Sequence, residues 1–510
     1  MAAGYWGPSK FCPSHIGSVR DWGDAGTGTF RKGEGKLNAN LSFIESLLMK
    51  PASFPFPSLL LFGLGALLSP ALLSAEELLW TQPSTELPAW MRDEVIYEVN
   101  VRQYSEEGTF DALTADLGRL EALGVSTLWL MPIHPIGEEN RKGPLGSYYA
   151  VRDYYGINPE FGTKADFAEF VEAATARGMR IILDWVGNHT AWDNPLAEER
   201  PDFYLTGDDG RYQPPTGFDW TDVIQLDFGN PEVLAYQIEA MRYWINEYGI
   251  DGFRCDYATG VPTSFWNEMS AALLATEPDL FLLAEAEVPD HQLDAFHASY
   301  GWSVLAAFDA IAQGKAPASH LDDVLANVRL RFPDESHFLY MTSNHDVNSW
   351  EGTVFERLGG GAEVFAVLSY MLDGIPLLYN GQEAGMDKRL LFFERDPIDW
   401  KPHPFHGLYR RLNRLKADHP ALAVGAPSLR IPSTADGEVY ALLREAGDRK
   451  LLFIGNLTPH DTEVRLGSRE LAGEWTDVFT GQRRNLGPSP LFSLRSWDYH
   501  VLQTSKSEQP

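Results

Sequence analysis

The feature that most constrains the fold is an alternation of short apolar runs with amphipathic segments, which extends from about residue 95 to residue 382. The runs are short and rich in apolar and β-branched residues, which is typical of buried strands. We expect strands at 95–104, 126–133, 180–186, 249–256, 280–287, 302–310, 338–344 and 376–382. Helical spacing of apolar residues predicts helices at 113–123, 167–177, 236–248, 265–276 and 360–372. Eight strands alternating with helices favour a closed parallel (β/α)8 TIM barrel over residues 90–421. A doubly wound open sheet is the alternative, but no Gly-rich phosphate loop follows the first strand.

Two further regions depart from this alternation. Residues 190–227, after the third strand, are rich in Asp, Pro, Gly and aromatic residues and predict a small inserted loop domain. Short strand-like runs at 439–443, 451–456, 462–466 and 497–503 predict a C-terminal antiparallel β-sandwich domain over residues 422–505. This domain holds no cluster of catalytic residue types, so we expect it to cover a barrel edge; binding carbohydrate is the alternative.

The amino terminus has the pattern of a secretory signal. Met49 and Lys50 precede an apolar stretch at 59–68, which is followed by small residues and then Glu76. The apolar stretch is too short to span a membrane as a helix. We therefore expect residues 1–48 to be a disordered, spurious upstream extension and residues 49–75 to be a signal peptide, giving a secreted or periplasmic protein. A genuine N-terminal region is the alternative.

Composition excludes several classes of partner. The 41 Lys and Arg against 71 Asp and Glu give a formal net charge of −30. A surface this acidic repels phosphate backbones and anionic lipid headgroups, so neither nucleic acid nor a membrane is an expected partner. The chain has only 2 Cys residues, which cannot form a disulfide framework. No feature specifies an oligomeric state.

Ionisable side chains gather at the carboxyl ends of four predicted strands, where the active sites of such barrels lie. These are Asp184, Arg254 with Asp256, Glu285 with Glu287, and His345 with Asp346. Arg254 and Asp256 share one strand face, so the guanidinium favours an ionised carboxylate at Asp256. A structural ion pair would explain that pair alone. Acids at four strand ends would repel one another if they only filled space, so the set favours catalysis.

The motifs at these strand ends resemble those of the α-amylase family of glycoside hydrolases. Four match in order and spacing: Asp184-x-x-x-Asn188-His189, Gly252-Phe253-Arg254-Cys255-Asp256, Leu283-Ala284-Glu285-Ala286 and Ser343-Asn344-His345-Asp346. Supporting stretches lie at 124–132, 149–154 and 374–383, and the resemblance covers nearly everything from about residue 90 to residue 503.

The resemblance implies a role for each matched residue. Asp256 is the implied nucleophile, Glu285 the general acid/base and Asp346 the third acid, which holds sugar hydroxyls. Arg254 would orient the nucleophile. The residues implied to bind the sugar at the cleavage point are His189, His345 and the stacking Tyr149, with Asp184 and Asn188 as supports.

The chemistry agrees with these residue types, because a retaining glycosidase needs one ionised carboxylate and one protonated carboxyl about 5–5.5 Å apart. The apolar strand before Glu285 suits the protonated group. Glu287 lies on the same strand face, so physical reasoning alone leaves both glutamates open; the family motif selects Glu285. Strand alternation points Cys255 away from the site and into the core.

The sequence departs from the family pattern at one place, which concerns the contacts to the leaving-group sugar. Many family members have a lysine and a histidine just beyond the nucleophile that contact the leaving-group sugar, whereas this chain has Thr259 and Gly260. A calcium site that uses the backbone of that histidine is put in doubt with it. Asn188 is the remaining candidate calcium ligand, and no cofactor is expected to be required.

We therefore expect a secreted retaining hydrolase of α-glucosidic bonds in starch-like polysaccharides or maltooligosaccharides. A transglycosylase or a sugar isomerase that uses the same covalent intermediate is the first alternative. A non-catalytic carbohydrate-binding scaffold is the second, although the presence of all three acids argues against it.

Overall fold

A computed structural model describes residues 85–504 of the 510-residue chain. The expected upstream extension at 1–48 and the expected signal peptide at 49–75 lie outside the described residues. Among residues 85–504, no helix is long and apolar enough to cross a membrane.

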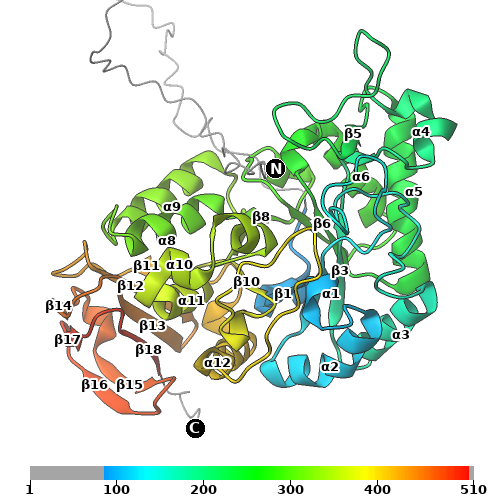
Figure 1. Ribbon diagram of the computed structural model, residues 1–510. Coiled ribbons are helices and arrows are strands. Elements are labelled where there is room, and N and C mark those ends of the chain that lie inside the picture. The colour runs from blue at the N-terminus through cyan, green and yellow to red at the C-terminus, as the bar shows by residue number, and fades with distance from the viewer. Residues whose placement is uncertain (1–84, 505–510) are drawn as a thin grey trace, which may run out of the picture. The chain divides into compact units, whose positions relative to one another are not determined.

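Eight parallel strands close into a barrel in the order β1-β10-β9-β8-β7-β6-β3-β2, as the sequence predicts (Figure 1). The strands are short, and nearly all of their residues are buried, because side chains fill the inside of the barrel and helices cover its outside. They are β1 (Ile96–Val99), β2 (Thr127–Leu130), β3 (Arg180–Trp185), β6 (Gly252–Cys255), β7 (Phe281–Ala284), β8 (Ala298–Tyr300), β9 (Phe338–Tyr340) and β10 (Ile375–Tyr379).

Helices follow the strands, and several of them begin or end at a residue that caps them. Thr163 and Asp166 form a capping box at the start of α3. Gly249 ends α5 in the left-handed conformation, with φ of 64°. The helices are α1 (Val101–Tyr104), α2 (Phe110–Leu123), α3 (Lys164–Thr175), α4 (Leu196–Glu199), α5 (Pro231–Tyr248), α6 (Thr263–Leu274), α7 (His291–Asp294), α8 (Trp302–Ala312), α9 (His320–Arg331), α10 (Val354–Leu358), α11 (Ala362–Met371) and α12 (Pro404–Asp418).

The expected strand at 302–310 is wrong: this segment is helix α8, and the sixth strand is β8, just before it. The segment is apolar almost throughout, so its period does not distinguish a strand from a buried helix. Gly301 marks the change between the two elements. A Cβ at this position would lie 2.8 Å from the Tyr340 ring and 3.1 Å from the Leu339 carbonyl oxygen, so only glycine lets the chain turn here.

The inside of the barrel is a packed core. A cluster of fully buried side chains fills it, including Ile96, Trp129, Ile182, Phe281 and Leu377. Because the interior is filled, polar chemistry is confined to the ends of the strands.

The insertion between β3 and β6 forms a two-stranded antiparallel ribbon of β4 (His189–Ala191) and β5 (Val223–Gln225), together with α4. His189 pairs with Gln225 and Ala191 with Val223. The insertion thus begins directly at the active-site end of β3.

The C-terminal region forms the expected antiparallel β domain. A six-stranded sheet has the order β11-β12-β13-β18-β15-β16, and β14 pairs with β17. Its strands are β11 (Ser428–Arg430), β12 (Val439–Ala446), β13 (Arg449–Asn456), β14 (Thr462–Arg465), β15 (Gly473–Asp477), β16 (Arg483–Leu486), β17 (Leu491–Leu494) and β18 (Tyr499–Thr504). Buried Arg444 on β12 donates to the carbonyl of Met371 at the end of α11 and pairs with Asp373. This domain therefore packs on the barrel.

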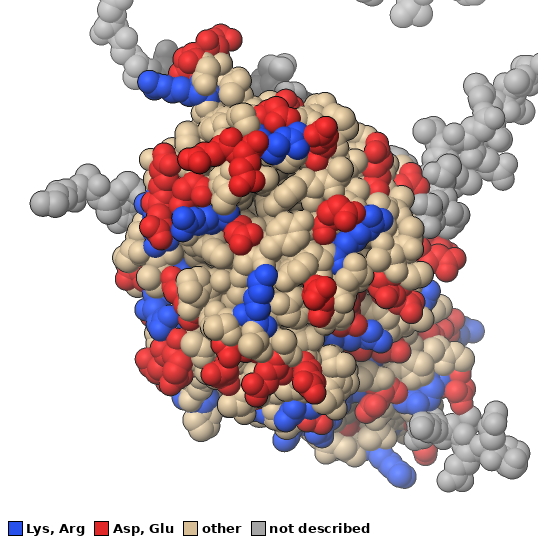
Figure 2. All heavy atoms as spheres, turned by 90° about the vertical axis from the view of Figure 1, so that its right-hand side faces the viewer, with Lys and Arg blue, Asp and Glu red and all other residues tan. Residues whose placement is uncertain are grey.

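Acidic side chains are prominent on the surface seen in Figure 2, with basic side chains scattered among them. This face is therefore mixed in sign but mainly acidic.

Candidate active site

The acids at the strand ends are brought together by the register of the barrel. Asp184 on β3 lies beside Arg254 on β6. The main chain continues the ladder past the ends of β6 and β7, because Asp256 N donates to Trp185 O at 2.9 Å and Glu285 N donates to Cys255 O at 3.0 Å. Asp256 and Glu285 are therefore held on adjacent strands at the same level of the rim.

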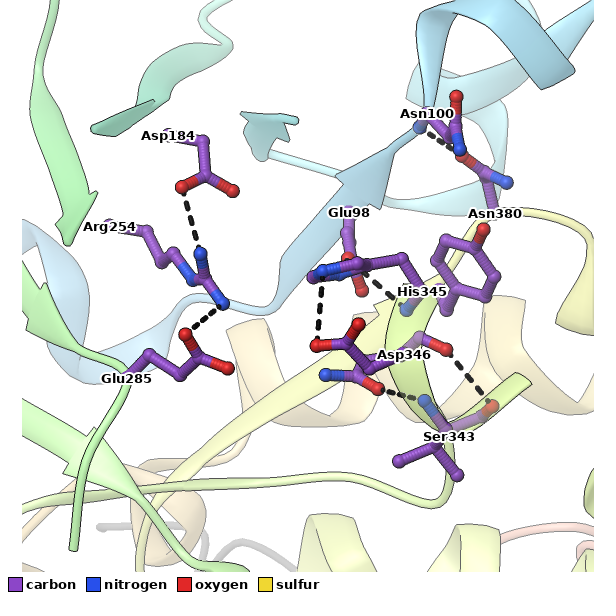
Figure 3. Close-up of polar contacts among 12 residues, drawn as sticks. Glu98, Asn100, Asp184, Arg254, Glu285, Ser343, His345, Asp346 and Asn380 are labelled. Atoms are coloured by element: carbon purple, nitrogen blue, oxygen red, sulfur yellow. Dashed lines mark hydrogen bonds and ion pairs between the residues drawn. The ribbon is translucent and has the colours of Figure 1, made fainter. Parts of the chain in front are cut away.

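Arg254 joins three of the carboxylates. Its Nη1 donates to Asp184 at 2.9 Å and to Asp256 at 3.0 Å, and its Nη2 forms an ion pair with Glu285 at 2.9 Å. Figure 3 shows this guanidinium between Asp184 and Glu285. The Arg254 side chain is fully buried, and its Nε donates to Tyr300 Oη at 3.2 Å. A planar fork of this kind fixes the orientation of each carboxylate that it binds.

Asp256 and Glu285 are thus bound by a single guanidinium. Arg254 favours an ionised Asp256, as the sequence indicates, but burial acts more strongly on this carboxyl. Burial and the neighbouring charge of Glu285 raise the pKa of Asp256 well above its ordinary range, although Arg254 acts in the opposite direction. Retaining chemistry needs one carboxylate and one carboxyl in such a pair.

Asp184 is a support in this cluster. It is buried, and burial raises its pKa to about 6 although Arg254 and His345 lower it. Its Oδ2 accepts a hydrogen bond from Tyr149 Oη at 3.1 Å. Asp184 therefore positions both the arginine and the tyrosine implied to stack on the sugar.

The geometry distinguishes Glu285 from Glu287. Glu285 Oε2 accepts from the Tyr257 main-chain N at 2.7 Å as well as pairing with Arg254. Glu287 accepts from Ser303 N at 2.7 Å and pairs with Arg331 at 2.7 Å. Glu287 is thus held by a separate structural ion pair, and Glu285 is the glutamate that lies beside Asp256.

On the other side of the site, His345 connects Asp346 to a buried glutamate. His345 Nδ1 lies 2.5 Å from Glu98 Oε1, and its Nε2 lies 3.3 Å from Asp346 Oδ2 and 2.7 Å from Tyr149 Oη. These contacts, except the one to Tyr149, can be followed in Figure 3. Burial opposes the charged ring, but the charges of Asp346 and Glu98 prevail and raise the pKa of His345 to about 9.

Sequence reasoning missed Glu98. It lies in the middle of β1, is fully buried, and contacts the site through His345. The available signal was a lone charged residue in an otherwise apolar barrel strand, since Glu is almost never fully buried without a partner.

His189 lies on the insertion side of the site. Burial lowers its pKa to about 3, so the ring is neutral, and it has a hydrogen bond with the Tyr149 main chain. Its Nδ1 lies 3.1 Å from Asn188 Nδ2, and its ring packs 5.5 Å from the ring of Trp220. Tyr149 thus contacts His345 through its hydroxyl and His189 through its main chain.

The residues around Asn188 do not fit a calcium site. Calcium takes six to eight oxygen ligands. Within residues 85–504, no group of three or more His, Cys, Asp or Glu side chains could hold a metal ion. The Asn188 side-chain oxygen already accepts from Gln225 Nε2 at 3.0 Å. No step of the chemistry is therefore assigned to a metal.

Cys255 is part of the core, as strand alternation predicts. It is buried and lies among Trp266, Met269 and Leu282, on the side of β6 that faces α6. It does not contact the reacting groups.

Both the barrel and the C-terminal domain match known proteins. The family description "Alpha amylase, catalytic domain" matches residues 92–216 and 217–402, and "Alpha amylase, C-terminal all-beta domain" matches residues 432–502. Alpha-amylase MalA of Haloarcula japonica is 30% identical over 420 residues, which are 78% of this chain and 60% of that protein. Alpha-amylase 2 of Dictyoglomus thermophilum is 26% identical over 440 residues, which are 78% of this chain and 74% of that protein.

Two solved structures are also similar. The α-amylase of Lactobacillus plantarum has a TM-score of 0.72 and 32% identity, covering 81% of this chain and 99% of its own. A noncanonic maltogenic α-amylase of Thermotoga neapolitana has a TM-score of 0.74 and 28% identity, with the same two coverages. Since the family descriptions match more than half of its residues, the chain belongs to the α-amylase family of glycoside hydrolases.

Proposed function

We propose that this protein hydrolyses α-glucosidic bonds in starch-like polysaccharides or maltooligosaccharides, with retention of the anomeric configuration. The observation that carries the proposal is the binding of Asp256 and Glu285 to one buried arginine, at 3.0 and 2.9 Å. The names of its relatives support this substrate class, since they include α-amylases, a neopullulanase and a maltosyltransferase.

The proposed reaction has two displacements. In the first, Asp256 attacks the anomeric carbon, the bond to the leaving sugar breaks, and the proton of Glu285 passes to the glycosidic oxygen. In the second, Glu285 takes a proton from water, the water oxygen bonds to the anomeric carbon, and the bond to Asp256 breaks. Arg254 keeps both carboxyls in place, while Asp346, 40% exposed at the opening, holds sugar hydroxyls.

The test is a time course with maltooligosaccharides and soluble starch, in which products are separated by length and the first-formed anomer is read by NMR. Shorter oligosaccharides released as α-anomers are expected. Products longer than the substrate would favour a transglycosylase, and a rearranged disaccharide would favour an isomerase. A β-anomer, or no reaction with any α-glucan, would overturn the proposal.

A pH dependence follows from the charged state of His345. Because its pKa is raised to about 9, the ring is charged at neutral pH and loses its proton as the pH rises through 9. The neutral ring cannot donate from both nitrogens, so kcat/KM should fall above about pH 9. Replacing Glu98 with Gln removes a charge that favours the charged ring, and should move this alkaline limb down by about one pH unit.

The pH profile of kcat/KM measures this effect, and Glu287→Gln is the matched control because Glu287 pairs with Arg331 and does not contact His345. An alkaline limb at the same pH in Glu98→Gln and in the unmodified enzyme would contradict the assignment of that limb to His345.

We also propose that the protein is exported, from the signal-like pattern of residues 49–75. Amino-terminal sequencing of secreted material measures this. A mature start between residues 70 and 77 is expected, and retention of Met1 would contradict it.

A further inference from the structure

Three aromatic side chains stand together beside the acid/base and have no role in the proposed chemistry. Phe218 and Trp220, from the insertion, are stacked with ring centroids 4.2 Å apart and planes 12° apart. Tyr257, which follows the proposed nucleophile, stands nearly perpendicular to both rings, at 5.2 and 5.0 Å. We call these three residues the aromatic platform.

The platform lies on the leaving-group side of the site. Tyr257 contributes the main-chain N that donates to Glu285 Oε2 at 2.7 Å. The group that protonates the glycosidic oxygen must lie beside that oxygen, so the residues next to Glu285 border the sugar that departs. Trp220 extends the same border toward the ring of His189, 5.5 Å away. Tyr149, by contrast, contacts Asp184 and His345 on the other side.

The rings are accessible to a ligand. Phe218 is 38% exposed, and Trp220 and Tyr257 are half-buried. A stacked, nearly parallel pair of rings with a third ring perpendicular to it offers an apolar corner, in which the outer face of the stack is available to a ligand. The flat face of a pyranose ring carries C–H groups that pack against aromatic faces in the same way as other apolar groups.

The chain accommodates the platform at a cost to its backbone. Tyr257 has φ of 40°, in the left-handed region that non-glycine residues rarely adopt. Gly260 makes room for it, because a Cβ at this position would lie 2.3 Å from Tyr257 Cε1. Strained residues persist where the surrounding structure holds them, and they cluster at functional sites.

This crowding also gives a physical reason for the departure noted in the sequence. A histidine at position 260, as many family members have, could not fit while the Tyr257 ring occupies that space. The position of the Tyr257 ring thus excludes a histidine at position 260.

The insertion end of the platform is held firmly. Lys142 forms ion pairs with Asp219 at 3.6 Å and with buried Asp222 at 3.8 Å. Trp192 Nε1 donates to Thr221 O at 2.9 Å. The segment that carries Phe218 and Trp220 is therefore fixed before any ligand arrives, which lowers the ordering cost of binding.

We propose that Phe218, Trp220 and Tyr257 form the subsite for the leaving-group sugar. When a sugar instead of water attacks the covalent intermediate, the same subsite binds that acceptor sugar. The three rings take the place of the lysine–histidine contacts that this chain lacks. The ligand is a glucose unit of an α-glucan, bound by stacking of its apolar face on the rings. This inference rests on the proposed function and specifies which residues bind the part of the glucan that departs.

The test compares two substrates that differ only in the leaving group. Maltotetraose places sugars on the leaving side, whereas α-maltosyl fluoride releases only fluoride. For Trp220→Ala and Phe218→Ala we expect kcat/KM on maltotetraose to fall about tenfold relative to kcat/KM on α-maltosyl fluoride, since one aromatic contact is worth about a factor of ten. Phe479→Ala is the control, because Phe479 packs on Tyr499 in the C-terminal domain.

Two further variants test the role of Tyr257. Tyr257→Phe keeps the ring. The ratio of kcat/KM on maltotetraose to kcat/KM on α-maltosyl fluoride should therefore stay within about twofold of that of the unmodified enzyme. Gly260→Ala should lower that ratio, because the added Cβ would lie 2.3 Å from Tyr257 Cε1 and displace the ring. The same Cβ would lie 2.7 Å from Asn188 Oδ1, and kcat/KM on α-maltosyl fluoride measures any effect that passes through Asn188.

The outcomes separate this inference from the proposed function. If the unmodified enzyme cleaves maltotetraose but the ratio in Trp220→Ala and Phe218→Ala equals that of Phe479→Ala, the platform is not a sugar subsite. If the unmodified enzyme cleaves neither substrate, the proposed function itself fails. If the ratio falls in the platform variants and not in Phe479→Ala, the result supports both the subsite and the proposed function.

Discussion

Replacement of Asp256 with Asn, or of Glu285 with Gln, is expected to lower kcat on maltooligosaccharides by at least about a thousandfold. The first change removes the attacking oxygen anion and the second removes the transferable proton. Neither change should unfold the protein, because each neutralises one of three carboxylates that share the single guanidinium of Arg254. The relief of like-charge repulsion should leave the melting temperature equal or higher. Steady-state kinetics and thermal melts followed by circular dichroism measure both quantities.

A substrate with a fluoride leaving group separates the two roles. Fluoride departs without protonation, so Glu285→Gln should still form the glycosyl-enzyme from an α-glycosyl fluoride and then stall, because the second step needs a base. Asp256→Asn should form none. Glu287→Gln is the matched control, since its carboxylate pairs with Arg331 and Ser303, and its kcat should stay within a few-fold of the unmodified value. Near-normal kcat on maltooligosaccharides in either catalytic variant would refute the assignment.

The fold and the ring of acids could be predicted because both follow from order along the chain. Short apolar runs separated by amphipathic helices specify a barrel, and a barrel brings residues that follow its strands to one rim. Counting strands therefore predicts that Asp184, Asp256, Glu285 and Asp346 lie together at that rim. Misreading α8 as a strand did not disturb this, because a strand, β8, does precede it and keeps the count of eight.

Other features of the site depend on contacts between residues far apart in the sequence, which the spacing of residues along the chain does not reveal. Glu98 acts through His345, 247 residues away in the sequence, so no local pattern connects the two. The influences on the pKa of Asp256 are only partly visible in the sequence, which shows the adjacent Arg254 but not burial or the approach of Glu285 from the next strand. The platform joins Trp220 in the insertion to Tyr257 after β6, and only the folded chain brings them within 5.0 Å.

The second large effect is expected at Arg254. Replacing it with Met should lower kcat at least about a thousandfold and destabilise the fold by about 3–5 kcal/mol, since it leaves buried carboxylates without a counter-charge. Arg254 is fully buried and contacts Asp184, Asp256 and Glu285. Arg254→Lys keeps the charge but has one ammonium in place of a planar fork, so it should recover much of the stability and little of the activity. Urea denaturation and kcat on maltooligosaccharides measure the two effects.

The double variant Arg254→Met with Asp184→Asn tests whether Arg254 acts by orienting Asp256 and Glu285 or only by balancing their negative charge. Removing the Asp184 carboxylate lowers the excess negative charge, so the double variant should regain part of the stability that Arg254→Met loses. It should regain no activity, because neither substitution restores the donors that aim Asp256 and Glu285 at 3.0 and 2.9 Å. If activity returned along with stability, the guanidinium would be only a counter-charge. Since a single fork reaches both reacting carboxyls, we expect stability to recover alone.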